Sequence, residues 1–259
     1  MHETLRFTVE NGIGWVRLDR PKKLNAINPQ MVRDLHAVVE SVRADESIHA
    51  LVFIGTGRAF SAGADLAELL ALGSNAAFLE FLEGIQGVYD EIEELGRPTV
   101  AALNGIAFGG GCELAISCDF RVMGESAKLG VPEILIGMLP GGGGTQRLSR
   151  LLPPAIAKQM ILLGDPIDAE TAARHGIVNA VVPDDQVESV ARALAQRFVS
   201  LPPLALRAGK RLVRSAADGD LATGLYAERQ AVAFLYGTED GREGIASFVE
   251  KRAAKFRGR

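Results

Sequence analysis

The segment Thr99–Ser117, with the sequence TVAALNGIAFGGGCELAIS, decides the fold of this chain of 259 residues. Thr99–Leu103 is a short apolar run that ends at the turn pair Asn104–Gly105, so it predicts a buried strand. Gly109–Gly111 follow, and the apolar run Cys112–Ser117 is compatible with a helix. A strand, a loop and a helix in such short succession require crossover connections between parallel strands, which indicates an α/β fold.

The same part of the chain carries two acidic residues in apolar surroundings. Glu113 lies early in the predicted helix, behind Gly109–Gly111, whose backbone N–H groups lie at the positive end of the helix dipole. Glu133 follows Pro132 in a second apolar run. Two carboxylates in one dry pocket cannot both ionise easily, so one pKa rises and that group can hold a proton near neutral pH.

Backbone N–H groups from two loops can also form an oxyanion hole, which binds a carbonyl oxygen as it becomes negative. Together with two acids, such a site favours proton transfer next to a carbonyl group, as in hydration, dehydration, isomerisation or enolate chemistry. The alternative is that Glu113 only caps a helix and that Glu133 is exposed at the surface. The spacing alone does not choose between these interpretations. The sequence contains no phosphate-binding P-loop, no dinucleotide-binding glycine motif and no His-Glu-x-x-His zinc motif.

The composition limits the class of protein. Hydrophobic residues make up 47% of the chain, which is enough for a large core. The formal net charge of −4 argues against a general nucleic-acid-binding protein. Cys112 and Cys118 lie in one predicted helix at a spacing that suits neither a disulfide nor a zinc site. No signal peptide is visible, and no apolar run approaches the ~18–20 residues of a membrane-spanning helix, so we expect a cytoplasmic protein. We also expect no bound metal ion.

The N-terminal part of the chain alternates strand and helix signals. Leu5–Val9 and Ile13–Leu18 flank Asn11–Gly12, which is a strong hairpin signal. Ala50–Ile54 predicts another buried strand, and Gly55–Asp65 predicts a loop.

A helix is expected to begin at Asp65 and to direct Leu66, Leu69 and Leu70 inward. No strand is expected after Gly144. The last part of the chain shows helical runs over residues 204–215, 221–236 and 240–256. We therefore predict an α/β core over residues 1–200 and an all-helical region over residues 201–259. A helical arm without a core of its own must pack on the body or on another subunit.

Four ordered motifs resemble those of a known family. Over nearly its whole length the chain is similar to the enoyl-CoA hydratase/isomerase family, also called the crotonase superfamily. The motifs are Arg58–Leu66 (RAFSAGADL), Asn104–Leu114 (NGIAFGGGCEL), Pro132–Ile134 (PEI) and Pro140–Leu148 (PGGGGTQRL). The resemblance implies a crotonase-like spiral of β-β-α units with an all-helical C-terminal region.

The resemblance also implies roles for individual residues. It implies that the N–H groups of Ala64 and Gly110 bind the thioester oxygen of an acyl-CoA. A side chain at position 110 would then crowd the thioester, which explains the glycine there. Glu133 is expected to protonate Cα, and Glu113 to hold and activate the water. The substrate would further be contacted by Lys23, Ala26, Ala62, Asp65, Leu66 and Gly141. From the C-terminal region, Phe248 and Lys251 would reach the CoA of a neighbouring subunit, with the lysine toward a phosphate.

The presence of both acids favours an enoyl-CoA hydratase within this family. Such an enzyme adds water across the double bond of a trans-2-enoyl-CoA to give a 3-hydroxyacyl-CoA, as in fatty acid metabolism. The alternatives are a Δ3,Δ2-enoyl-CoA isomerase, a hydratase for a branched substrate such as methylglutaconyl-CoA, and a catalytically weak binding or assembly protein. No separate cofactor is implied, since CoA is part of the substrate. The family resemblance implies a homotrimer, or a homohexamer built as a dimer of trimers.

Overall fold

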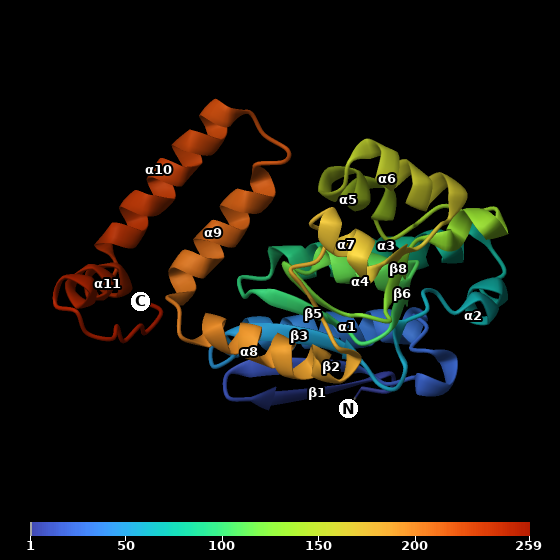
Figure 1. Cartoon of the computed structure of the whole chain (residues 1–259), viewed down its shortest axis with the longest axis horizontal. Helices are drawn as coiled ribbons and strands as arrows, with labels where there is room; N and C mark the ends of the chain where they lie inside the picture. The colour runs from blue at the N-terminus through green and yellow to red at the C-terminus, as the bar shows by residue number, and fades with distance from the viewer. Residues whose placement is uncertain (1) are drawn as a thin grey trace.

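Two β-sheets form the body of the protein (Figure 1). The computed structural model describes residues 2–259, and within them the larger sheet has six strands in the order β1-β2-β3-β5-β7-β10. These strands are β1 (Leu5–Glu10), β2 (Ile13–Leu18), β3 (Ala50–Gly55), β5 (Thr99–Leu103), β7 (Phe120–Gly124) and β10 (Ala180–Val182). The smaller sheet has the order β4-β6-β8-β9, with β4 (Ala59–Ser61), β6 (Ile106–Phe108), β8 (Lys128–Gly130) and β9 (Ile167–Asp168).

Successive strands alternate between the two sheets. β3, β5 and β7 belong to the larger sheet, and the strand that follows each of them, β4, β6 or β8, belongs to the smaller one. Pairing is parallel from β2 to β10 in the larger sheet and from β4 to β8 in the smaller one. Helices complete the crossovers, with α3 (Asn75–Glu94) before β5 and α4 (Gly110–Ser117) before β7. This is a spiral of β-β-α units, so the predicted α/β fold class is confirmed.

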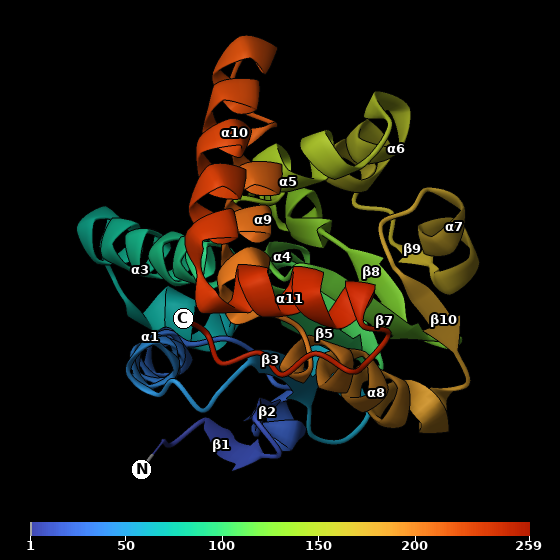
Figure 2. The ribbon, with the colours of Figure 1, turned by 90° about the vertical axis from the view of Figure 1, so that its left-hand side faces the viewer.

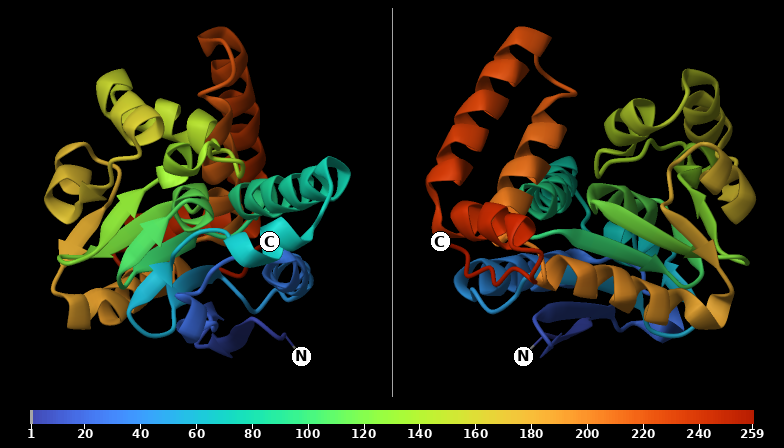
Figure 3. Two further views of the ribbon diagram at one scale, coloured as in Figure 1. Left: turned by 90° about the vertical axis from the view of Figure 1, so that its right-hand side faces the viewer. Right: turned by 60° about the vertical axis from the view of Figure 1, so that its left-hand side comes forward.

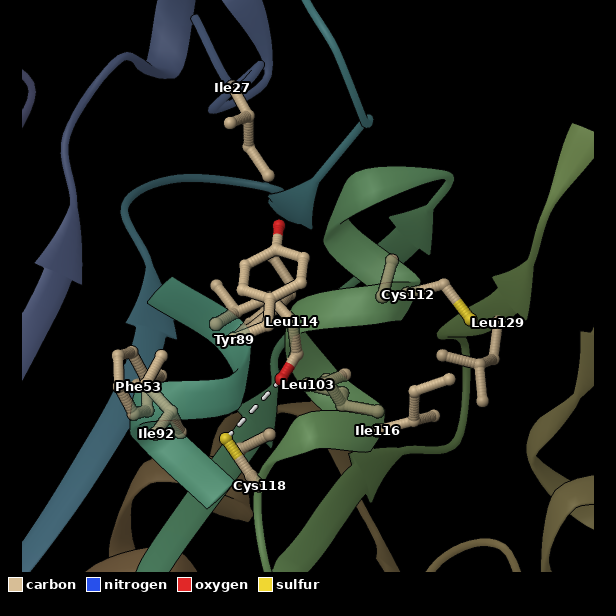
Figure 4. Packing of buried hydrophobic residues seen from close by; sticks show 14 of the residues in the cluster. Ile27, Phe53, Tyr89, Ile92, Leu103, Cys112, Leu114, Ile116, Cys118 and Leu129 are labelled. Atoms are coloured by element: carbon tan, nitrogen blue, oxygen red, sulfur yellow. Dashed lines mark hydrogen bonds between the residues drawn. The ribbon is translucent and has the colours of Figure 1, made fainter. Parts of the chain in front are cut away.

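Helices cover both faces of the larger sheet. α1 (Pro29–Ala44), α3 and α4 contribute to the main hydrophobic core, part of which is shown in Figure 4. α8 (Val187–Val199) packs on the opposite face around the fully buried Trp15, and Figure 3 shows its course along the sheet. The remaining helical segments of the body are α2 (Leu66–Ala71), α5 (Gly144–Leu151), α6 (Pro154–Lys158), the π-helical turn Gln159–Leu163, α7 (Ala169–Arg174) and the 3-10 turns Pro21–Lys23, Pro132–Ile136 and Asp184–Gln186.

Local sequence signals explain several element boundaries. Asn11 and Gly12 both have positive φ, 51° and 77°, as a two-residue turn between β1 and β2 requires. Asn28 caps α1 by accepting a hydrogen bond from the N–H of Met31, and Pro29 starts the helix. The two cysteines are buried thiols: Figure 4 shows Cys112 beside Leu129, while Cys118 donates to the carbonyl of Leu114.

The last three helices form an arm beside the sheets. α9 (Pro203–Ser215) and α10 (Leu221–Gly237) pack against each other as an antiparallel pair, and α11 (Glu239–Val249) crosses the end of this pair (Figures 1 and 2). The C-terminal segment folds back on α11, because the Asp240 carboxylate accepts the N–H groups of Arg257 and Gly258. The backbone of residues 257 and 258 is therefore held against the start of α11. Within residues 2–259 no helix combines the length and apolar character needed to cross a bilayer.

Several boundaries predicted from the sequence are wrong. β9 and β10 follow Gly144, and β4 lies inside the segment predicted as a loop. These strands have two or three residues each, so partners distant in sequence stabilise them and no local periodicity marks them. α11 ends at Val249 instead of residue 256, where the polypeptide turns back with Lys251 at a φ of 56°.

Candidate active site

Two glycine-containing loops meet at one end of the smaller sheet. A Cβ atom built on Gly63 would lie 2.9 Å from the carbonyl oxygen of Phe108 and 3.5 Å from the Cα atom of Gly109. Gly63 and Gly109 have φ values of 98° and 49°, and glycine is the residue that tolerates both this conformation and this close approach. The contact brings the next residue of each loop, Ala64 and Gly110, into the same small region.

Each of these two residues presents a backbone N–H group that has no acceptor among residues 2–259. Ile27 forms a parallel bridge with Ala64, donating to the carbonyl of Gly63 and accepting from the N–H of Asp65. In a parallel bridge this pattern leaves the N–H of Ala64 directed away from Ile27. Gly110 is the first residue of α4, so its N–H lies at the unpaired end of the helix. The two donors can therefore bind an oxygen atom.

Glu113 is buried inside the next turn of α4, with 2% of its surface exposed. Its Oε1 atom accepts the N–H of Gly144 at 2.7 Å, which is the first residue of α5 and the last of the glycine loop Gly141–Gly144. A Cβ atom on Gly142 would lie 2.7 Å from Oε2, so this loop packs on the carboxyl group as bare backbone. Burial raises the pKa of Glu113 to about 7, the donors of Gly144 and Gly142 oppose this shift, and the charge of Glu133 adds to it.

Glu133 approaches the same region from the 3-10 turn Pro132–Ile136. Its Oε1 atom would lie 2.6 Å from a Cβ on Gly109. Its Oε2 atom is buried and has no hydrogen-bond partner among residues 2–259, and burial raises the pKa of this carboxyl group. Such a buried acceptor carries a free-energy cost unless a ligand satisfies it. The alternative of a helix-capping Glu113 and a surface Glu133 does not describe this arrangement, because the N-cap of α4 is Gly109 with no side-chain cap and the Oε2 atom of Glu133 is buried.

Two acids with raised pKa values and two unpaired N–H groups thus surround one point. Among known proteins, the model of the family described as "Enoyl-CoA hydratase/isomerase" matches residues 8–259. The chain belongs to the enoyl-CoA hydratase/isomerase family. A probable enoyl-CoA hydratase of Rhizobium meliloti is 39% identical over 100% of this chain and 99% of its own. A crotonyl-CoA hydratase of Syntrophomonas wolfei is 37% identical, with 98% of both chains covered.

Solved structures of the family share the fold. A crystal structure of an enoyl-CoA hydratase subunit from Geobacillus kaustophilus superposes with a TM-score of 0.94 at 39% identity, covering 100% of this chain and 99% of that one. An enoyl-CoA hydratase from Bacillus anthracis gives a TM-score of 0.95 at 33% identity, with 99% and 100% covered. The family resemblance read from the sequence is therefore confirmed.

The segments to which the family resemblance assigns CoA binding lie beside the two loops. The N–H of Ala62 donates to the carbonyl of Leu24, and the buried Asp65 both caps α2 and pairs with Arg20 at 2.9 Å. Arg20 lowers the pKa of Asp65, although burial opposes this shift. Ala26 is buried and Lys23 is exposed on the adjoining turn. Gly141 is fixed against α3, because its carbonyl accepts the side-chain amide of Gln86 at 2.7 Å. Contact of these residues with CoA stays a prediction.

The expected inward orientation of the α2 leucines is wrong for Leu66 and Leu70 and is confirmed for Leu69. Leu66 is 55% exposed and Leu70 is 86% exposed, while only Leu69 packs against the core. The helix has six residues and approaches the body through one edge, which leaves its other apolar side chains accessible. Phe248 is also exposed, at 85%, near the end of α11, and Lys251, just beyond this helix, is exposed as well.

Sequence reasoning missed two residues that hold the site together. The hydroxyl of the fully buried Tyr89 donates to the carbonyl of Gly110 at 2.7 Å, and Figure 4 shows it directed toward Ile27. Asn25, buried with a φ of 57°, donates its side-chain amide to the carbonyls of Thr56 and Ala59. Tyr89 has the sequence signal of an ordinary core position of α3. The positive φ of Asn25 is compatible with its type but is not predictable from the neighbouring residues.

The pKa of Glu113 predicts a pH-dependent stability. Because it is raised from 4.5 to about 7, the folded protein binds more protons than the unfolded chain in this interval, and its free energy of unfolding falls as the pH rises. Glu113→Gln cannot ionise and removes this term. Relative to the parent, we expect the variant to gain on the order of 3 kcal/mol in free energy of unfolding between about pH 4 and pH 8, measured in urea. A difference that does not change with pH would contradict the raised pKa.

Proposed function

We propose that the protein is a hydratase that adds water to a trans-2-enoyl-CoA. The observation that supports this proposal is the pair of buried acids, Glu113 and Glu133, beside the unpaired N–H groups of Ala64 and Gly110. A hydratase needs one acid to handle water and another to handle the proton at carbon, whereas an isomerase needs a single group to move a proton between two carbons. Similar proteins include a crotonyl-CoA hydratase and, at 40% identity over 93% of this chain, a 2,3-dehydroadipyl-CoA hydratase of Escherichia coli.

The arrangement permits a complete addition of water. The thioester oxygen accepts the N–H groups of Ala64 and Gly110, which withdraws electron density and makes Cβ electrophilic. A water held by Glu113 forms the new O–C bond at Cβ and gives its proton to the Glu113 carboxylate. The electron pair of the double bond moves through Cα onto the thioester oxygen as an enolate. When the enolate collapses, Cα takes the proton of Glu133, and a proton passed from Glu113 to Glu133 through water restores the starting state.

Substrate turnover tests this function directly. The parent enzyme is expected to consume crotonyl-CoA, which is followed by the loss of the ultraviolet absorbance of the enoyl thioester. Conversion of a 3-enoyl-CoA without hydration of crotonyl-CoA would instead identify an isomerase. Binding of acyl-CoA without turnover of either substrate would identify a binding protein. A panel of straight and branched enoyl-CoA substrates then distinguishes a short-chain hydratase from one for a methylglutaconyl-type substrate.

We further infer that the C-terminal arm is an oligomerisation region, in a homotrimer or a homohexamer built as a dimer of trimers. Large apolar side chains are exposed on all three of its helices, which is unusual for a free surface. They are Val213, Leu221, Leu225, Tyr226, Val232, Phe234, Tyr236, Ile245, Phe248 and Val249. A neighbouring subunit would bury these side chains.

If the CoA site is shared between subunits, Lys251→Ala is expected to raise the KM for crotonyl-CoA ~10-fold or more while kcat changes little. The lysine would contact a phosphate far from the reacting carbons, so its interaction is equal in the ground and transition states. Steady-state kinetics measures this split. Lys255→Ala is the matched control, since it removes a cation from the same C-terminal segment. A monomer in sedimentation at micromolar concentration would contradict the shared site.

A further inference from the structure

Arg147 makes several polar and charged contacts next to the site, and the mechanism above does not use it. It lies on α5, just after the glycine loop Gly141–Gly144, and 13% of its side chain is exposed. Its Nη1 atom donates to the carbonyl of Gly142 at 2.8 Å. Its Nε atom donates to Glu93 at 2.7 Å and its Nη2 atom to Asp90 at 2.6 Å, both on α3. All three nitrogen atoms of the guanidinium thus donate hydrogen bonds.

The glycine loop lies between Arg147 and Glu113. On the inner side, the N–H of Gly144 donates to Glu113 at 2.7 Å. On the outer side, a Cβ on Gly143, whose φ is 101°, would lie 2.0 Å from the Nη1 atom of Arg147. The guanidinium therefore occupies the space next to the loop and fixes its backbone. A displacement of the loop would move the donor that Glu113 accepts.

The same arginine is connected to the C-terminal arm. Glu93 accepts from Arg147 and also pairs with Arg214 of α9 at 3.5 Å, between Nε and Oε2. Arg214 pairs in addition with Glu94 at 2.6 Å. A continuous series of charged contacts thus runs from α9 through α3 and α5 to the loop on which Glu113 rests. The bonds of Arg147 to Glu93 and Asp90 are charged hydrogen bonds, which are stronger and more directional than neutral ones, whereas Arg214 and Glu93 form a longer ion pair.

We propose that Arg147 is a positioning residue for Glu113, and that Glu93 links this positioning to the C-terminal arm through Arg214. Arg147 acts in two ways. Its hydrogen bonds hold the loop Gly142–Gly144 against the carboxyl group, and its positive charge favours the carboxylate form of Glu113. The charge effect agrees with the direction in which Arg147 shifts the pKa of Glu113, which is downward. The tests of this inference that measure turnover rest on the proposed hydratase function.

Two substitutions separate the hydrogen bonds from the charge. Arg147→Met removes both, so kcat for crotonyl-CoA is expected to fall ~10–100-fold, with a much smaller change in KM. The acidic limb of the pH–rate profile is expected to move to higher pH, because the carboxylate of Glu113 loses a stabilising cation. Arg147→Lys keeps the charge but cannot span three acceptors, so the limb should stay in place while kcat remains reduced. Arg214→Met removes the ion pairs with Glu93 and Glu94 but leaves the contacts of Arg147 in place, so it is expected to reduce kcat ~2–5-fold without moving the limb.

The control is Arg174→Met, which removes an arginine paired with Glu170 on the exposed surface of α7. It should leave both kcat and the pH profile unchanged. Arg147→Met with the parent's kcat and limb would overturn the proposal. An equal loss of kcat in the methionine and lysine variants, with no shift of the limb in either, would also overturn it, since this is the result of a purely structural role.

A measurement without substrate separates this inference from the proposed function. The carboxyl titration of Glu113 can be followed by NMR of 13C-labelled glutamate in the parent and in Arg147→Met, with Glu113→Gln to assign the signal. A pKa that is higher in Arg147→Met supports the positioning role even if the parent does not hydrate crotonyl-CoA, in which case only the hydratase proposal fails. An unchanged titration overturns the role assigned to Arg147.

Discussion

Replacing either Glu113 or Glu133 by glutamine is expected to reduce the rate of crotonyl-CoA hydration ~10²–10⁴-fold. Glutamine keeps the size and polarity of the side chain but cannot accept or deliver the proton. Because the two acids act as a unit, each single variant should already lose most of the rate, and the double variant should lose little more. The assay is the loss of enoyl-thioester absorbance under saturating substrate.

The control for this pair is Glu170→Gln, which removes a carboxylate from an exposed ion pair on α7 and should leave the rate unchanged. Hydration at close to the parent rate by Glu113→Gln would show that this residue does not handle the water. If one of the two glutamine variants instead retained most of its activity on a 3-enoyl-CoA, the enzyme would be an isomerase.

Gly109→Ala is expected to lower kcat/KM at least ~10²-fold, which is the typical effect of losing one oxyanion donor. A methyl group there would lie 2.6 Å from the Oε1 atom of Glu133, and the φ of 49° is unfavourable for any residue with a Cβ. The strain would displace Glu133 and rotate the peptide that carries the N–H of Gly110. The protein would tolerate a Cβ atom better at Gly110 than at Gly109, because at Gly110 it would meet only side-chain atoms of Ile27, Ile85 and Tyr89, at 3.3 Å or more.

Gly176→Ala is the matched control for Gly109→Ala. Its φ of 71° carries the same kind of backbone strain, but no atom lies within 4 Å of the added methyl group. It should therefore lower the free energy of unfolding by ~1–2 kcal/mol without changing kcat/KM. Circular dichroism of both variants establishes that they are folded. Normal turnover by a folded Gly109→Ala would mean that the thioester does not depend on this loop.

The amino-acid sequence by itself determined the α/β class and the main elements. The run Thr99–Leu103 between turn signals became β5, and the pair Asn11–Gly12 became the β1–β2 turn, because both signals act over a few neighbouring residues. The sequence also indicated Glu113 and Glu133 as unusual, since acids in apolar runs need a compensating reason. The family followed from four ordered motifs, and the comparisons bear it out.

The tertiary structure decided what depends on contacts between distant segments. The strands β4, β8 and β9 exist only because they pair with partners far along the chain, so their own two or three residues show no pattern. Burial and the charge of Glu133 raise the pKa of Glu113, and its donor comes from Gly144, thirty-one positions away. Arg147 has the sequence signal of a surface helix residue. Only the packing of α5 against α3 makes it a neighbour of the site, because a guanidinium is satisfied by acceptors in space and not by its position in the sequence.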